Sequence, residues 1–104
     1  MYFLVYEQRK GADEPIDDLG GLVTGLTEWL SYLQQLMKKG TVVQHWGFRG
    51  QHGSVTVYDV ASGEELQEIL KRNPMDDRWI RREIYPVCTI EQELEHVFKF
   101  MTGV

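Results

Sequence analysis

The chain has little cysteine, no long hydrophobic run and no excess of basic charge, and each shortage excludes a class of protein. Cys88 is the single cysteine among 104 residues, so an internal disulfide framework and a multi-cysteine metal site are both excluded. No run approaches the roughly 20 apolar residues that a membrane helix requires. The formal net charge of −5 argues against a general nucleic-acid binder, because neutralising phosphates needs clustered cations.

Signals for targeting, phosphate binding and serine hydrolysis are also missing. The apolar residues 2–6 are followed at once by the polar residues 7–10, without the basic lead and long apolar core of a signal peptide, so we expect a cytoplasmic protein. There is no P-loop, no GxGxxG after a strand and no GxSxG. His45 and His52 match no recognised metal-ligand spacing. We expect no metal, cofactor, nucleic-acid partner or membrane partner.

What the sequence does contain is an alternation of strand and helix patterns. β-Branched and aromatic residues predict strands over 2–8, 41–49, 54–60 and 79–88. Apolar residues at steps of three and four predict an amphipathic helix between the first two strands. Glycines weaken its beginning, so Thr24 is the latest position at which we expect the regular helix to start. The apolar stripe of this helix comprises Leu19, Leu22, Leu26, Trp29, Leu30, Leu33, Leu36 and Met37.

Two capping boxes mark the beginnings of the other helices. Ser62 with Glu65 predicts the start of a helix that Pro74 stops, and Thr89 with Gln92 predicts the start of a terminal helix. The resulting order, βαββαβ plus a C-terminal helix, is that of a ferredoxin-like α+β sandwich. We therefore expect a single domain over residues 1–104, with its core in 1–88 and the terminal helix in 89–102.

The predicted strands are apolar on both faces. In the first strand, Leu4 and Tyr6 alternate with Phe3 and Val5. A bare sheet face is normally polar, and a large exposed apolar patch marks an interaction site. The sheet of a second copy is the economical cover and gives a symmetric dimer with a pocketed interior. The alternative is that the terminal helix covers part of the sheet.

The strand over 41–49 carries most of the candidate chemistry. Strict alternation places Val43 on the side of His45, and Val42 and Trp46 on the opposite side. For Trp46, packing in the core against the helices is the favoured interpretation, and a cavity wall is the alternative.

This architecture resembles the dimeric α+β barrel superfamily and, within it, muconolactone isomerase. The similarity lies in Gly40-Thr41, a strand containing Trp46, a turn with Gly50, and residues 57–60 before a capped helix. It extends over about residues 1–88. The resemblance implies a homodimer, or a higher homo-oligomer, closed through its sheets into a barrel. It also implies a cofactor-free proton shift on a small unsaturated lactone that bears a carboxylate, in aromatic catabolism.

Two departures from related patterns bear on the chemistry. The isomerase pattern has a histidine two residues before the tryptophan, where this chain has Gln44, with His45 beside it on the opposite face. A weaker resemblance to the YCII-related family rests on residues 2–8 and on Asn73-Pro74. The histidine and aspartate that this second family carries on its first helix are absent here.

Three residues are candidates for the reaction itself. His45 is the first candidate base, because an imidazole titrates near neutral pH, and Glu7 is the second, because burial can raise the pKa of a carboxylate. Arg49 can bind a substrate carboxylate through its bidentate fork. The structural alternatives are a hydrogen-bonded histidine, a solvated strand end and an exposed turn residue.

Further residues are candidates for the pocket. Trp46, Tyr58 and Tyr6 shape it if they face the cavity, and Arg82 is a candidate polar group on the fourth strand. His52, at the hairpin tip, is a candidate for closing the pocket. Two other functions remain open: a non-catalytic small-molecule-binding or structural oligomeric module, and a cofactor-free monooxygenase of an aromatic substrate. Ligand protection without substrate consumption would indicate the first, and oxygen uptake the second.

Overall fold

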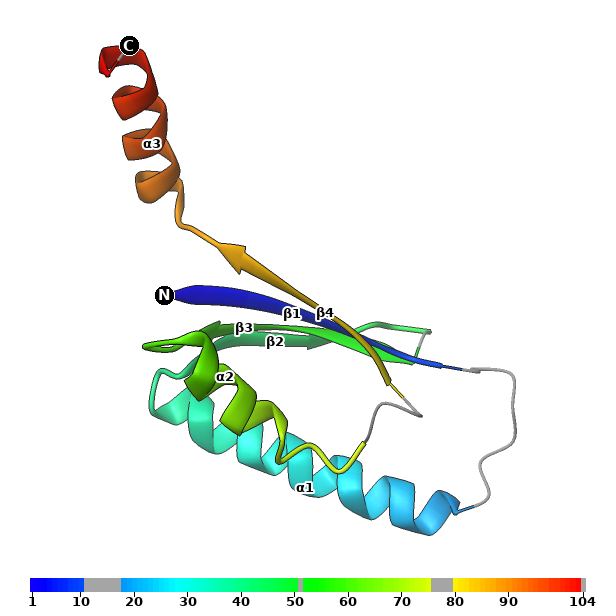
Figure 1. Cartoon of the computed structure of the whole chain (residues 1–104). Helices are drawn as coiled ribbons and strands as arrows, with labels where there is room; N and C mark the ends of the chain where they lie inside the picture. Colours follow the sequence, from blue (N-terminus) through cyan, green and yellow to red (C-terminus); the bar gives the residue numbers. More distant parts are fainter. Residues whose placement is uncertain (11–17, 51, 76–79, 104) are drawn as a thin grey trace.

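Strands and helices follow one another in the order that the sequence predicts. The computed structural model describes residues 1–10, 18–50, 52–75 and 80–103. Within them, the strands form one antiparallel sheet in the order β2-β3-β1-β4, and α1 and α2 lie on one face of it (Figure 1). None of the helices in these residues is long and apolar enough to cross a membrane. The elements are β1 (Tyr2–Arg9), α1 (Leu19–Lys38), β2 (Val42–Gly47), β3 (Gly53–Asp59), α2 (Gly63–Leu70), β4 (Ile80–Val87) and α3 (Ile90–Thr102).

Helix α1 begins earlier than its glycines suggest. The Asp18 carboxylate accepts a hydrogen bond from the Gly21 amide at 2.9 Å and caps the helix, which starts at Leu19. The helix therefore begins at the first residue of the predicted stripe and not at Thr24, the latest start that was expected, because the cap offsets the low helix propensity of the glycines. The helix ends before Gly40, whose φ of 82° is open to glycine without strain.

The predicted capping box is complete at α3, whereas at α2 the Glu65 carboxylate bonds one residue before the N-cap Ser62. Ser62 accepts a hydrogen bond from the Glu65 amide, and the Glu65 carboxylate reaches back to the amide of Ala61 at 2.8 Å. At the start of α3, Thr89 and Gln92 form a reciprocal capping box. Both helices therefore begin where the sequence places them.

A β-bulge in β2 decides which residues face the helices. The register shifts between Val42 and Gln44, so Val42 pairs with Tyr58 and His45 pairs with Thr56. Both β2 residues therefore face α1, and Val42 is 1 % exposed. The prediction that placed Val42 opposite His45 was wrong, because one extra residue reverses the alternation of side chains.

The two faces of the sheet differ in what covers them. The helix-covered face contributes Val5 and Tyr58 to a core completed by α1 and α2. On the open face Trp46 is 53 % exposed, which corrects the favoured assignment of this residue to the core. The Tyr6 ring lies 5.5 Å from the Phe48 ring. From the register, the apolar open face comprises Tyr2, Leu4, Tyr6, Trp46, Val55, Val57, Tyr85 and Val87.

Helix α3 leaves the sheet at the end of β4 and points away from the rest of the molecule (Figure 1). The molecule measures 58 × 29 × 24 Å, and its radius of gyration is 16.6 Å. A compact chain of this length would have a radius of gyration of roughly 13 Å. The terminal helix therefore extends away from the sheet of its own chain, and only its first turns approach the ends of β1 and β4. Its exposed apolar residues are Ile90, Leu94, Val97, Phe98, Phe100 and Met101.

Candidate functional site

A cavity of about 440 Å³ lies between α1 and the covered face of the sheet. Its helix wall is apolar, and its sheet wall carries carboxylate, imidazole and hydroxyl groups. A pocket with one apolar and one polar wall suits a small ring whose polar groups lie on one side. The lining residues from α1 are Leu19, Leu22, Leu26, Trp29 and Leu30, and those from the sheet and its connections include Glu7, Arg9, His45, His52, Ser54, Asn73, Met75 and Ile80.

Glu7 is a buried carboxylate on the sheet wall, with 5 % of its surface exposed. Its Oε2 atom accepts hydrogen bonds from Arg82 Nη2 at 3.0 Å and from Asn73 Nδ2 at 3.2 Å. Glu7 and Arg82 are direct cross-strand partners on β1 and β4, so the register of the sheet brings them together. A buried charge requires such a partner, and the pair fixes the carboxylate in the wall of the cavity.

His45 is a half-buried imidazole on the same wall. Its Nδ1 atom lies 2.7 Å from the hydroxyl of Thr56, the residue opposite it on β3. Burial lowers the pKa of His45, and the negative charge of Glu7 opposes this shift in part. The ring is therefore neutral at pH 7. In the tautomer whose Nδ1–H donates to Thr56, the Nε2 atom keeps its lone pair and can accept a proton.

The predicted aromatic residues do not line this cavity. Tyr6 and Trp46 lie on the opposite face of the sheet from His45. Tyr58 is fully buried in the core. Burial, followed by the charge of Glu7, raises the pKa of Tyr58, which keeps its hydroxyl protonated. The aromatic ring that does line the cavity is Trp29, which the helix stripe had assigned to the core alone.

The predicted polar residues divide between the cavity and the surface. Arg49 is exposed beside the turn at Gly50 and does not line the cavity, whereas His52 is exposed and does line it. Arg82 is held by Glu7, with 21 % of its side chain exposed. Among the described residues, no three His, Cys, Asp or Glu side chains gather into a group that could hold a metal.

Sequence reasoning missed Asn73 as a partner of Glu7, Thr56 as a partner of His45, and Arg9 as a lining residue. Asn73 was assigned only to the end of a helix, and its contact with Glu7 spans 66 positions of the chain. Thr56 and His45 are neighbours only through the bulged register of β2 and β3. The one available signal was alternation along β1, which puts Arg9 on the same side as Glu7.

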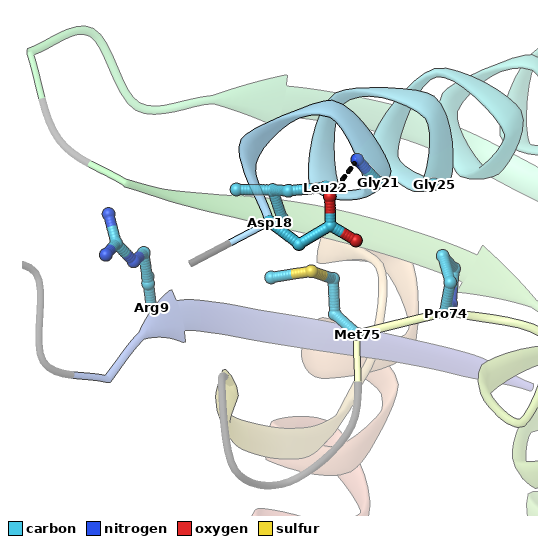
Figure 2. A pocket seen from close by; sticks show the side chains of 7 residues that line it. All are labelled: Arg9, Asp18, Gly21, Leu22, Gly25, Pro74 and Met75. Carbon is cyan, nitrogen blue, oxygen red and sulfur yellow. Dashed lines mark hydrogen bonds between the residues drawn. The ribbon is translucent and has the colours of Figure 1, made fainter. Parts of the chain in front are cut away.

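A smaller cavity of about 230 Å³ adjoins the first at the beginning of α1 (Figure 2). The two cavities share Arg9, Leu22 and Met75. Asp18 lines only the smaller one, where its carboxylate caps the helix. The shared residues make Arg9 a boundary between the two spaces.

Comparison with known proteins fits this architecture. The profile of the family described as "Muconolactone delta-isomerase" matches residues 26–93, from α1 to the beginning of α3. The chain belongs to the muconolactone delta-isomerase family. The matched residues include His45 and Arg82, whereas Glu7 and Arg9 precede them. The predicted resemblance to this isomerase family is thereby confirmed.

Two relatives carry the name of this isomerase. The chain is 36 % identical to the muconolactone Delta-isomerase of Rhodococcus opacus over 45 residues, which cover 43 % of this chain and 48 % of that protein. It is 33 % identical to the muconolactone Delta-isomerase of Acinetobacter baylyi (strain ATCC 33305 / BD413 / ADP1) over 61 residues, which cover 59 % of this chain and 54 % of that protein. The chain thus spans about half the length of the curated relatives that it matches.

Solved structures establish the fold. A crystal structure of muconolactone isomerase superposes with a TM-score of 0.70 at 24 % identity, covering 86 % of this chain and 90 % of that one. The 5-chloro-2-hydroxyhydroquinone dehydrochlorinase of Burkholderia phenoliruptrix AC1100, in complex with 2,5-dihydroxybenzoquinone, superposes with a TM-score of 0.64 at 16 % identity, covering 88 % and 98 %. The predicted α+β, ferredoxin-like fold class is confirmed.

Proposed function

We propose that this chain catalyses a cofactor-free proton shift on a small unsaturated lactone that carries a carboxylate, as a step of aromatic catabolism. The observation that carries the proposal is the pair formed by His45 and Glu7 on the polar wall of the cavity. A proton shift between carbons requires a base that is unprotonated at working pH and close to a shaped apolar surface. His45 supplies the base, and the α1 wall supplies the surface.

Glu7 assists this step electrostatically. When His45 takes the proton, the ring becomes a cation, and the negative charge of Glu7 stabilises that cation. The transferred proton is then returned by His45 to another carbon of the same ring. Asn73 donates one amide hydrogen to Glu7 and retains a second for the oxyanion of the dienolate intermediate. In this scheme His45 moves the proton, Glu7 stabilises the imidazolium cation, and Asn73 binds the oxyanion.

The direct test is conversion of muconolactone by the purified protein, followed by ultraviolet absorbance against a boiled control. Turnover well above the control is the expected result. Absence of turnover, combined with protection of the fold by the lactone, would replace this proposal with a non-catalytic binding module. Oxygen uptake with an aromatic substrate would replace it with a cofactor-free monooxygenase.

We also propose that a second copy of the chain covers the open face of the sheet. This face is apolar at Leu4 and Val57, which are cross-strand partners near its centre. Burial of such an exposed apolar face is favourable, and the same face on a second copy offers a self-complementary cover. The cavity that holds His45 lies on the other side of the sheet, so this association leaves it accessible.

Leu4→Lys and Val57→Lys should each convert the assembly to monomers. A lysine placed in an apolar interface loses its hydration without gaining a partner, so the dimer should dissociate at about 10 µM chain, where the parent stays associated. Light scattering coupled to size-exclusion chromatography gives the mass directly. Glu64→Lys, on the exposed side of α2, is the control and should leave the mass unchanged. A parent chain that is monomeric at this concentration would contradict the proposal.

A further inference from the structure

We propose that Arg9 binds the carboxylate of the substrate and thereby orients its ring toward His45 and Glu7. The inference rests on the proposed function in one respect, since it assumes a substrate that carries a carboxylate. It replaces the sequence-based assignment of this role to Arg49.

The first argument is the distribution of positive charge around the cavity. Among the described residues that line the large cavity and its smaller neighbour, Arg9 is the one that carries a guanidinium or ammonium group. Arg49 is exposed beside the hairpin turn and lines neither space. Arg82, whose guanidinium donates to the Glu7 carboxylate, lines neither space. An anionic ligand in either cavity therefore meets its positive partner at Arg9.

The second argument is the position of Arg9 relative to the proposed reacting groups. Arg9 and Glu7 are two residues apart on β1 and share a face, which separates their Cα atoms by about 7 Å. Figure 2 shows the Arg9 side chain rising from the end of β1, on the side of the sheet where the first turn of α1 lies. A small ring with a carboxylate at one end can therefore span from Arg9 to the His45–Glu7 wall.

The third argument is repulsion, which fixes the direction of the ligand. The buried charge of Glu7 disfavours a second carboxylate beside it. Asp18 places another carboxylate in the smaller cavity and disfavours an anion there. Within the large cavity, the end next to Arg9 and away from Glu7 is the favourable position. The ring then points inward, toward the imidazole.

Arginine is chemically suited to this role. Its planar fork offers five N–H donors, so it can bind a carboxylate bidentately while keeping a contact with the protein. Charge-assisted hydrogen bonds of this kind correspond to about a 10- to 100-fold difference in affinity. A substrate without the charge should lose that factor.

Calorimetry with a matched pair of ligands tests the assignment. The ligands are the saturated lactone acid, which has no double bond to shift, and its methyl ester. The parent chain should bind the acid about 30-fold more tightly than the ester. Arg9→Met should remove this preference and leave the affinity for the ester unchanged. Arg49→Met, the matched control, should keep the preference.

Other outcomes would overturn the inference. They are equal binding of acid and ester by the parent, failure of both to bind, an intact preference in Arg9→Met, or a lost preference in Arg49→Met. Circular dichroism verifies the fold of each variant, and Arg9→Gln is a second variant if Arg9→Met does not fold. Because calorimetry needs no turnover, an inactive chain that keeps an Arg9-dependent preference refutes only the proposed isomerisation. An active chain whose preference survives Arg9→Met refutes only the role of Arg9.

Discussion

Replacing His45 with alanine should lower kcat/KM for the proton shift by about 100- to 1,000-fold, because a positioned general base contributes a factor of this size. The fold should be retained, since His45 is only half-buried and, among the described residues, its ring is hydrogen-bonded to Thr56 alone. Ultraviolet absorbance of muconolactone conversion measures the effect.

The matched control for this substitution is His52→Ala. His52 lines the same cavity but is exposed at the hairpin and has no assigned part in the proton shift, so its removal should lower kcat/KM far less than the removal of His45 does. An equal loss in both variants would indicate a general effect on the hairpin. Parent-like turnover in His45→Ala would remove His45 as the base.

The pH dependence of turnover offers an independent measurement on the same residue. Burial holds the pKa of His45 below its usual value of 6.5, so the neutral base persists into mildly acidic solution. Turnover should fall as the pH drops through this lowered pKa. The residual activity of His45→Ala should lack this acidic limb. An acidic limb that begins above pH 6.5 would contradict the lowered pKa.

The lowered pKa of His45 also makes the free energy of unfolding depend on pH. Because the folded state holds the His45 pKa below the unfolded value of 6.5, the unfolded chain binds more protons between the two values. The contribution of His45 to the free energy of unfolding is therefore fully present above pH 6.5. It is lost progressively as the pH falls from 6.5 toward the folded pKa.

The order of elements could be predicted from the sequence because its signals are local. The periodic stripe of α1 and the capping residues of α2 and α3 each act within a few positions of the chain. Two local signals can also favour different positions for the start of the same helix. Helix α1 begins at Leu19 because the Asp18 cap is present, although its glycines favour a later start.

The candidate site was predicted only in part because its contacts depend on strand register. His45 and Glu7 were identified by their chemistry, and the structure places both in one cavity. The bulge in β2 was not visible in the sequence, so the predicted face of Val42 was wrong. Trp46 was assigned to the core because large aromatic residues usually are buried, yet the open face exposes it. The cross-strand pairing that joins Glu7 to Arg82 spans 75 positions of the chain.

Removing the Glu7 carboxylate should affect both stability and turnover, and a double variant separates the two effects. Glu7→Leu leaves the guanidinium of Arg82 buried without its partner, which should lower the free energy of unfolding by about 3 kcal/mol. The Glu7→Leu/Arg82→Leu variant removes both charges and should recover most of this loss, because an apolar pair of similar volume replaces a buried ion pair at little cost. Urea denaturation measures both values.

Turnover should respond differently from stability in these variants. Glu7→Gln preserves the shape of the side chain but removes the charge that stabilises the protonated His45, so kcat should fall by at least about tenfold. The double leucine variant should be stable and yet equally impaired, since it also lacks that charge. Parent-like turnover in the stable double variant would show that the carboxylate serves the fold alone. Impaired turnover in a chain of restored stability would place its charge in the reaction, because no loss of folded protein could then account for the result.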